Sequence, residues 1–128
     1  MDEPRFLTIA EVLYLHDESL KRFGGSAGIR EAGLVGSALG SAQNAYWYGR
    51  GNLYDIAAAY AFHLAQAQAF VDGNKRTAVA AAIAFLKVNG AGFPKDDGAL
   101  YSAMIDIAKK TLDKPGLAAV IRRLAEQK

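Results

Sequence analysis

The chain has 128 residues and a mass of 13.7 kDa, the size of one domain with a single hydrophobic core. Its net charge of +2 excludes a broad basic surface for nucleic acid or anionic membranes. The absence of cysteine excludes disulfide scaffolds, thiolate zinc sites and cysteine nucleophiles. Residues 1–10 do not resemble a signal peptide, and no stretch of about 18 apolar residues predicts a membrane-spanning helix. We therefore expect a cytoplasmic protein with no membrane partner.

Alanine dominates the apolar residues, with 25 copies in the chain and 14 of them between residues 51 and 100. Alanine is the best helix former and a poor strand former, and the 3 prolines leave long stretches unbroken. The fold class we expect is all-α, as one single-domain bundle of about six helices over residues 1–128. So many small side chains also predict that these helices pack closely together.

The first predicted helix begins at a capping box formed by Thr8 and Glu11, and it ends at the glycine pair 24–25. His16 falls within it, beside Asp17. We expect this histidine to be half-exposed and paired with its acidic neighbour, the ordinary state of a histidine on a surface helix.

A loop rich in glycine comes next, and apolar spacing then predicts a short helix over about 33–44. The aromatic cluster at 46–51 (YWYGRG) is either a stacking platform for a base or a packed loop. Asn52 and Asp55 have the spacing of a second cap, which opens an apolar central helix over 56–69.

Another alanine-rich helix covers 78–88 and ends at Asn89-Gly90. Asp96 or Asp97 is expected to cap the next helix. The last helix starts around Asp113-Lys114-Pro115, and its two outward arginines, Arg122 and Arg123, are expected to be ordinary solvated surface.

One polar segment, Asp72-Gly73-Asn74-Lys75-Arg76, interrupts the most apolar part of the chain. Gly73 and Asn74 can adopt a turned backbone that points consecutive amides at one anion, and the following helix adds its positive end. Lys75 and Arg76 supply positive charge, while Asp72 can hold a magnesium ion that bridges phosphates. The segment therefore indicates a site for the phosphates of a nucleotide. The alternative is a capped turn between two helices.

Residues 57–90 resemble the signature segment of the Fic/Doc (Fido) superfamily, in its death-on-curing toxin branch, and residues 28–39 resemble that branch's second recurring segment. The resemblance implies an all-helical fold with the motif loop between two central helices. It also implies ATP-dependent phosphorylation of a threonine on a translation elongation factor, which stops protein synthesis. The implied cofactors are ATP, as substrate, and Mg²⁺. The implied partner is an antitoxin whose disordered tail folds as a helix on the toxin.

By the same resemblance, Phe70 anchors the motif loop in the core and Asp72 binds magnesium. Gly73-Asn74 corresponds to the anion-binding turn, and Arg76 to the arginine that holds the phosphates. Lys75 stands where adenylylating Fic enzymes have a glycine, and lysine there resembles the branch associated with phosphate transfer. These positions match the family motif His-Pro-Phe-x-Asp/Glu-Gly/Ala-Asn-Lys/Gly-Arg.

The first two motif positions differ, because Gln68 replaces the catalytic histidine and Ala69 replaces the proline. The histidine's family role is to take the proton of the attacking hydroxyl, and glutamine has no group that titrates near neutral pH. Such a change arises by deliberate inactivation, by natural decay, or in a variant with another base. His63 is five residues earlier, about 140° around the helix from Gln68, so we do not expect it to substitute.

Two functions compete on these grounds. The first is a death-on-curing toxin with phosphotransfer slowed or silenced by Gln68. The second is a pseudoenzyme that keeps affinity for a nucleotide or a partner without chemistry. Nucleic-acid binding through Lys75, Arg76, Arg122 and Arg123 is a weaker third, since phosphate-backbone affinity is built from many cations.

Overall fold

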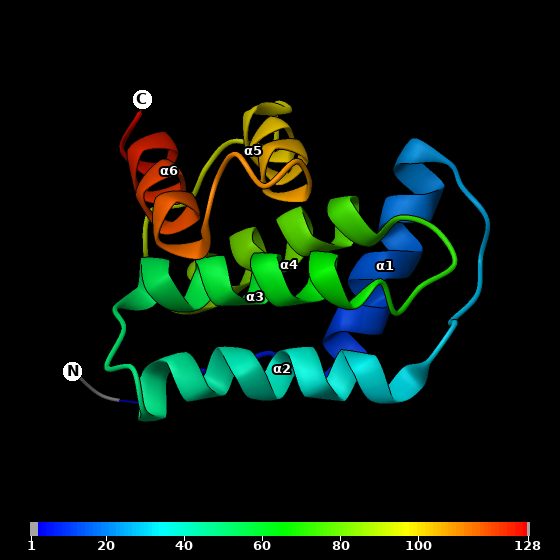
Figure 1. The fold of residues 1–128 in the computed structure, drawn as a ribbon, viewed down its shortest axis with the longest axis horizontal. Helices are drawn as coiled ribbons and strands as arrows, with labels where there is room; N and C mark the ends of the chain where they lie inside the picture. The colour runs from blue at the N-terminus through cyan, green and yellow to red at the C-terminus, as the bar shows by residue number, and fades with distance from the viewer. Residues whose placement is uncertain (1–2, 128) are drawn as a thin grey trace.

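The computed structural model describes residues 3–127, which contain six α-helices and no β-strand (Figure 1). The predicted all-α fold class and helix number are therefore confirmed for this part of the chain. The helices are α1 (Ile9–Phe23), α2 (Ala32–Trp47), α3 (Leu53–Ala67), α4 (Asn74–Val88), α5 (Ala99–Ala108) and α6 (Lys114–Glu126).

Helix α3 is the centre of the bundle. It packs against α4 and α2 over most of its length, and against α5 and α6 on the side away from α2 (Figure 1). Helix α1 lies across the end of the molecule where the loop between α3 and α4 turns. Three helices therefore meet at that loop, which spans residues 68–73.

The core of the bundle is built largely from alanine, as the composition predicts. Alanine has no side-chain atom beyond Cβ, so two alanine-rich helices can bring their backbones close together. The buried surfaces of α3 and α4 contain seven alanines with no exposed area: Ala57, Ala58, Ala59, Ala61, Ala78, Ala81 and Ala82. Larger side chains, above all Tyr60 and Phe85, fill the remaining space between the helices.

Capping boxes set the starts of α1 and α3, as predicted. The Thr8 hydroxyl accepts from the amide of Glu11 at 3.1 Å, and the Glu11 carboxylate accepts from the amide of Thr8 at 2.9 Å. The pair Asn52 and Asp55 repeats this arrangement at the start of α3, with distances of 2.9 and 3.0 Å. Each box satisfies two amides that have no partner inside the helix.

Three helix boundaries differ from the sequence prediction. Helix α4 begins at Asn74 rather than at residue 78, because its first hydrogen bond already runs from the Thr77 amide to the Gly73 carbonyl. Helix α2 continues to Trp47, beyond the expected end near residue 44, because Tyr46 packs edge-on against Phe6 with ring centroids 6.0 Å apart. The prediction of a loop was therefore wrong for Tyr46 and Trp47, which form the last turn of the helix. Helix α3 ends at Ala67 rather than residue 69, because Gln68 adopts a left-handed conformation.

The C-terminal helices largely follow the prediction. The Asp97 side chain accepts from the amide of Ala99 at 3.1 Å, although Gly98 occupies the N-cap position itself. Asp113 caps α6 by accepting from the amide of Gly116 at 2.8 Å. Arg122 and Arg123 are exposed, as expected. No helix within residues 3–127 combines the length and apolar character needed to cross a membrane.

Candidate functional site

The loop between α3 and α4 contains two left-handed residues that reverse the chain. Gln68 has φ 48° and ψ 46°, and Gly73 has φ 78° and ψ 18°. Between them, Phe70 is 2% exposed and anchors the loop in the core, as predicted. The Asn74 side chain closes the loop, because Oδ1 accepts from the Phe70 amide at 3.1 Å and Nδ2 donates to the Phe70 carbonyl at 3.0 Å. The Asn74 side chain therefore holds the backbone of Phe70 through both its amide and its carbonyl.

The segment before α2 pairs with this loop. The Arg30 amide donates to the Ala69 carbonyl at 2.7 Å, and the Val71 amide donates to the Gly28 carbonyl at 3.0 Å. These two bonds form an isolated antiparallel bridge between Ile29 and Phe70. The two sequence segments singled out above, 28–39 and 57–90, are thus held together by backbone hydrogen bonds.

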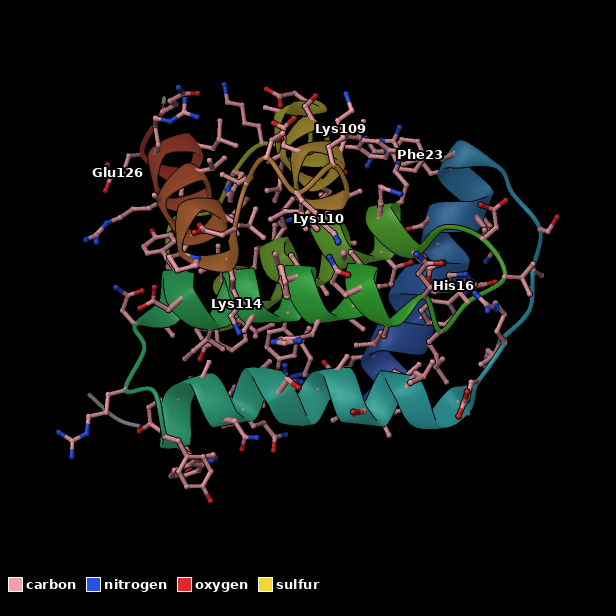
Figure 2. All side chains as sticks on the ribbon, viewed as in Figure 1. His16, Phe23, Lys109, Lys110, Lys114 and Glu126 are labelled. Carbon is pink, nitrogen blue, oxygen red and sulfur yellow. The ribbon has the colours of Figure 1, made fainter. Side chains whose placement is uncertain are left out.

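His16 contacts the loop from α1, and here the sequence prediction was wrong. The ring is 6% exposed and stacks on Phe70, with centroids 3.8 Å apart and planes 9° apart. Its Nε2 donates to the Asp72 carbonyl at 2.8 Å. Figure 2 shows His16 on α1, beside the loop between α3 and α4. The neighbouring Asp17 pairs with Lys21 instead, at 3.2 Å. The reason is position on the helix: His16 follows buried Val12 by four residues and therefore faces the core.

The Asp72 carboxylate is oriented by backbone amides. Its Oδ1 accepts from the Gly73 amide at 2.9 Å and its Oδ2 accepts from the Ser26 amide at 3.2 Å. The loop after α1 approaches closely here: a Cβ on Gly25 would lie 2.9 Å from Oδ2, and Gly25 has φ +121°. Only glycine satisfies both conditions without strain. Two separate segments therefore hold this exposed carboxylate in one direction.

A cavity of about 570 Å³ opens over the loop. This volume falls in the range of small-molecule sites. The structure brings all the predicted site residues together in its wall. The lining residues are Phe23, Gly24, Gly25, Ala65, Gln68, Val71, Asp72, Gly73, Asn74, Lys75, Arg76 and Tyr101.

The cavity is electropositive at the start of α4. The first helical hydrogen bond runs from the Thr77 amide to the Gly73 carbonyl at 3.0 Å, so the amides of Asn74, Lys75 and Arg76 have no acceptor inside the helix. The positive end of the helix dipole adds to the two side-chain charges. Neither Lys75 nor Arg76 forms an ion pair within residues 3–127. The arrangement can hold a polyanion.

The carboxylate of Asp72 fits the way proteins bind Mg²⁺ beside phosphates. Magnesium usually takes one or two carboxylates, keeps several waters, and obtains its other ligands from the phosphates. Each Asp72 oxygen accepts one amide hydrogen bond and keeps a lone pair for a metal. Within residues 3–127 no group of three or more His, Asp or Glu side chains forms a cage for a metal on its own. A metal here depends on phosphate ligands.

His63 lies outside this cavity. It lines a separate hollow with Ser37, Ser41 and Gln66, and its Nε2 accepts from the Lys114 ammonium at 3.1 Å. Burial, and then the Lys114 charge, lower the pKa of His63 below its usual value. The structure therefore gives His63 a packing and hydrogen-bonding role, and it does not bring His63 to Gln68.

Four residues at or beside the motif loop were not predicted from the sequence: His16, Ser26, Phe23 and Tyr101. His16 had a signal, since residues 12, 16 and 20 share one face of a helix. Ser26 acts through its backbone amide, which no side-chain pattern reveals. Phe23 and Tyr101 come from α1 and α5, far from the motif in sequence, and only the packing of the helices places them at the cavity.

Two known proteins resemble most of the chain, and a family model matches more than half of it. Residues 6–86 match the Fic/DOC family. The chain is 30% identical over 121 residues to the protein kinase doc of Escherichia phage P1, covering 94% of this chain and 95% of that protein. It is 39% identical over 110 residues to the toxin Doc of Mycolicibacterium smegmatis, covering 80% of this chain and 82% of that protein. The chain therefore belongs to the Fic/Doc family.

Proposed function

We propose that this protein is a Doc-type toxin that transfers the γ-phosphoryl group of ATP to a threonine hydroxyl of a translation elongation factor. One observation carries the proposal: Asp72, Lys75, Arg76 and the free amides of α4 converge on one electropositive cavity of about 570 Å³. The names of two relatives support it, one as a protein kinase and the other as a toxin.

Each group has a distinct role in this proposal. The start of α4, with Lys75 and Arg76, holds the phosphate oxygens and balances the charge that develops on them during transfer. Asp72 is the residue that would hold Mg²⁺, which supplies further neutralisation of the phosphates when bound. The threonine oxygen forms a bond to the γ-phosphorus, the bond from that phosphorus to the bridging oxygen breaks, and ADP leaves with the electron pair.

Removal of the proton from the threonine hydroxyl is the step that we expect Gln68 to slow. Gln68 lines the same cavity as Asp72 and Lys75. We take it, from the resemblance of residues 68–76 to the family motif, to stand in place of the family's histidine. Its amide oxygen can accept a hydrogen bond from the hydroxyl and orient it, but it does not take the proton. The proton is then lost to solvent or to a phosphate oxygen. A missing general base typically slows a reaction by about 10²- to 10⁴-fold, so we expect slow transfer.

Gln68 also favours a second function. A chain with this substitution can keep the phosphate site and lose the chemistry, which would make it a module that binds a nucleotide or a partner. In either function the partner we propose is an antitoxin, in line with the toxin name of one relative. Its disordered tail would fold as a helix on the toxin, a mode that couples ordering to binding.

Transfer of label from γ-labelled ATP to a purified elongation factor tests the proposal. The parent protein should transfer slowly, Gln68→His should be about 10²- to 10⁴-fold faster, and Gln68→His with Arg76→Ala should lose the gain. If neither the parent nor Gln68→His transfers label to the elongation factor, the proposed phosphotransferase activity is refuted. Binding of Mg·ATP without transfer, lost in Asp72→Ala and Arg76→Ala, would favour the binding module.

A further inference from the structure

The guanidinium of Arg76 lies against two aromatic rings that belong to other helices. Its Cζ is 4.0 Å from the ring centroid of Phe23, at the end of α1, and 3.8 Å from that of Tyr101, in α5. Both distances are well within the range of a cation–π contact. Figure 2 shows Phe23 at the end of α1, on the side that faces α5. Arg76 is therefore held where α1, α4 and α5 meet.

These ring contacts leave the hydrogen-bonding capacity of Arg76 unused. Within residues 3–127 the guanidinium forms no ion pair, and no side-chain hydrogen bond of Arg76 is observed. The nearby Arg22 differs, because it pairs with Asp96. A guanidinium has five N–H donors in a rigid plane, suited to bidentate contact with phosphate oxygens. Arg76 is thus immobilised without having a donor occupied by an acid.

Immobilising the side chain before the ligand arrives has a measurable consequence. A free arginine loses rotamer entropy when it binds, whereas a side chain already held by its surroundings does not lose it again. Phe23 and Tyr101 line the same cavity as Arg76, so the rings act at the point where a phosphate would bind. Neither ring belongs to the 68–76 segment or offers a charge to the ligand.

We propose that Phe23 and Tyr101 are positioning residues that hold Arg76 with its N–H donors ready for the phosphates of a nucleoside triphosphate. This rests on the proposed function for the identity of the ligand. In this arrangement α1 and α5, which carry none of the motif, set the affinity of the phosphate site. Removing either ring frees Arg76 and weakens binding by about 2- to 10-fold.

Calorimetric titration with Mg·ATP, and separately with magnesium tripolyphosphate, tests the inference on the parent and four variants. Tyr101→Leu and Phe23→Leu remove one ring each, and Tyr101→Phe keeps the ring. Tyr48→Leu is the matched control, because Tyr48 is 84% exposed and does not line the cavity. We expect both ring-removing variants to raise the Kd for both ligands by about 2- to 10-fold, with Tyr101→Phe and Tyr48→Leu unchanged.

A spectroscopic readout separates positioning from a general loss of structure. The rings should shift the Arg76 side-chain resonances upfield, and this shift should shrink in each leucine variant while melting temperatures show that the protein stays folded. Phe23 is 43% exposed at a helix end, so Phe23→Leu keeps the test valid if Tyr101→Leu fails to fold.

Two binding results would refute different conclusions, one the positioning role of the rings and the other the proposed function. A parent that binds the ligands, with leucine variants that bind equally well, refutes the positioning role alone. A parent that binds neither Mg·ATP nor magnesium tripolyphosphate refutes the proposed function, and the inference with it.

Discussion

His16 should stabilise the fold through two separable interactions with the motif loop. The ring stacks on Phe70 at 3.8 Å, and Nε2 donates to the Asp72 carbonyl at 2.8 Å. A stacked aromatic pair contributes about 0.5–1.5 kcal/mol beyond its burial, and a typical hydrogen bond contributes about 0.5–1.5 kcal/mol net. Because Asp72 is exposed, water can replace the lost donor, so the lower half of that second range applies.

Two substitutions separate these contributions. His16→Phe keeps a flat ring and loses the donor, so the free energy of unfolding should fall by about 0.5–1 kcal/mol. His16→Ala loses the stack as well and leaves a cavity, so the loss should exceed that of His16→Phe by at least about 1 kcal/mol. Urea denaturation followed by circular dichroism measures both changes.

The difference in unfolding free energy between His16→Phe and His16→Ala tests whether the stack on Phe70 stabilises the fold. Equal losses in His16→Phe and His16→Ala would show that the stack on Phe70 contributes nothing. A loss below about 0.5 kcal/mol in His16→Ala would refute the whole assignment of a buried, bonded histidine. His16→Phe should also weaken Mg·ATP binding, because the Asp72 backbone is no longer held, whereas a purely packing role for His16 predicts unchanged binding.

Four further predictions concern three polar residues that do not line the cavity, namely Tyr60, Thr77 and His63. Tyr60→Phe should lower the free energy of unfolding, measured in urea, by about 1–3 kcal/mol. The buried Leu7 amide donates to the Tyr60 hydroxyl oxygen at 2.9 Å, and the substitution leaves that amide without an acceptor. An unchanged midpoint of urea unfolding would contradict this. Burial raises the pKa of Tyr60 to about 12, so stability should fall as pH rises from about 10 through 12, and Tyr60→Phe should remove that component of the alkaline loss. Thr77→Val should stabilise the fold by about 1 kcal/mol, because the fully buried Thr77 hydroxyl has no hydrogen-bond partner within residues 3–127. A lower melting temperature in Thr77→Val would contradict this. Because burial lowers the pKa of His63 in the folded protein, His63 takes up its proton at a higher pH in the unfolded chain than in the folded one. The free energy of unfolding should therefore decrease as pH falls below 6.5 in the parent, and decrease less in His63→Gln. Parallel curves of stability against pH for the two proteins would argue against the burial of His63 beside Lys114.

Local patterns in the sequence predicted much of the fold because the interactions that set them are local. Thr8 and Asn52 begin their helices through side-chain bonds to residues three positions later, and such spacing is visible in the sequence. Alanine content predicted close packing of α3 and α4 because small side chains determine how near two helices can come. The end of α2 was missed because the contact that extends it, Tyr46 with Phe6, joins residues 40 positions apart.

In the candidate site too, residues close together in sequence were predicted and residues brought in by tertiary packing were not. The residues from Phe70 to Arg76 were found because they follow one another along the chain and resemble a family motif, and Gln68 was found from its place in that motif. Phe23 and Tyr101 reach the cavity from α1 and α5, and His16 contacts the motif loop from α1. All three do so through tertiary packing that no spacing along the chain encodes. The sequence also favoured a half-exposed His16 paired with the adjacent Asp17, yet adjacent residues on a helix point in different directions.

The most direct test of the central claim is the intact mass of an elongation factor after incubation with Gln68→His and Mg·ATP. Our account predicts a gain of one phosphate on a threonine, absent when Arg76→Ala is added to the same variant. An unmodified factor, or one that gains a nucleotide instead of a phosphate, would contradict it.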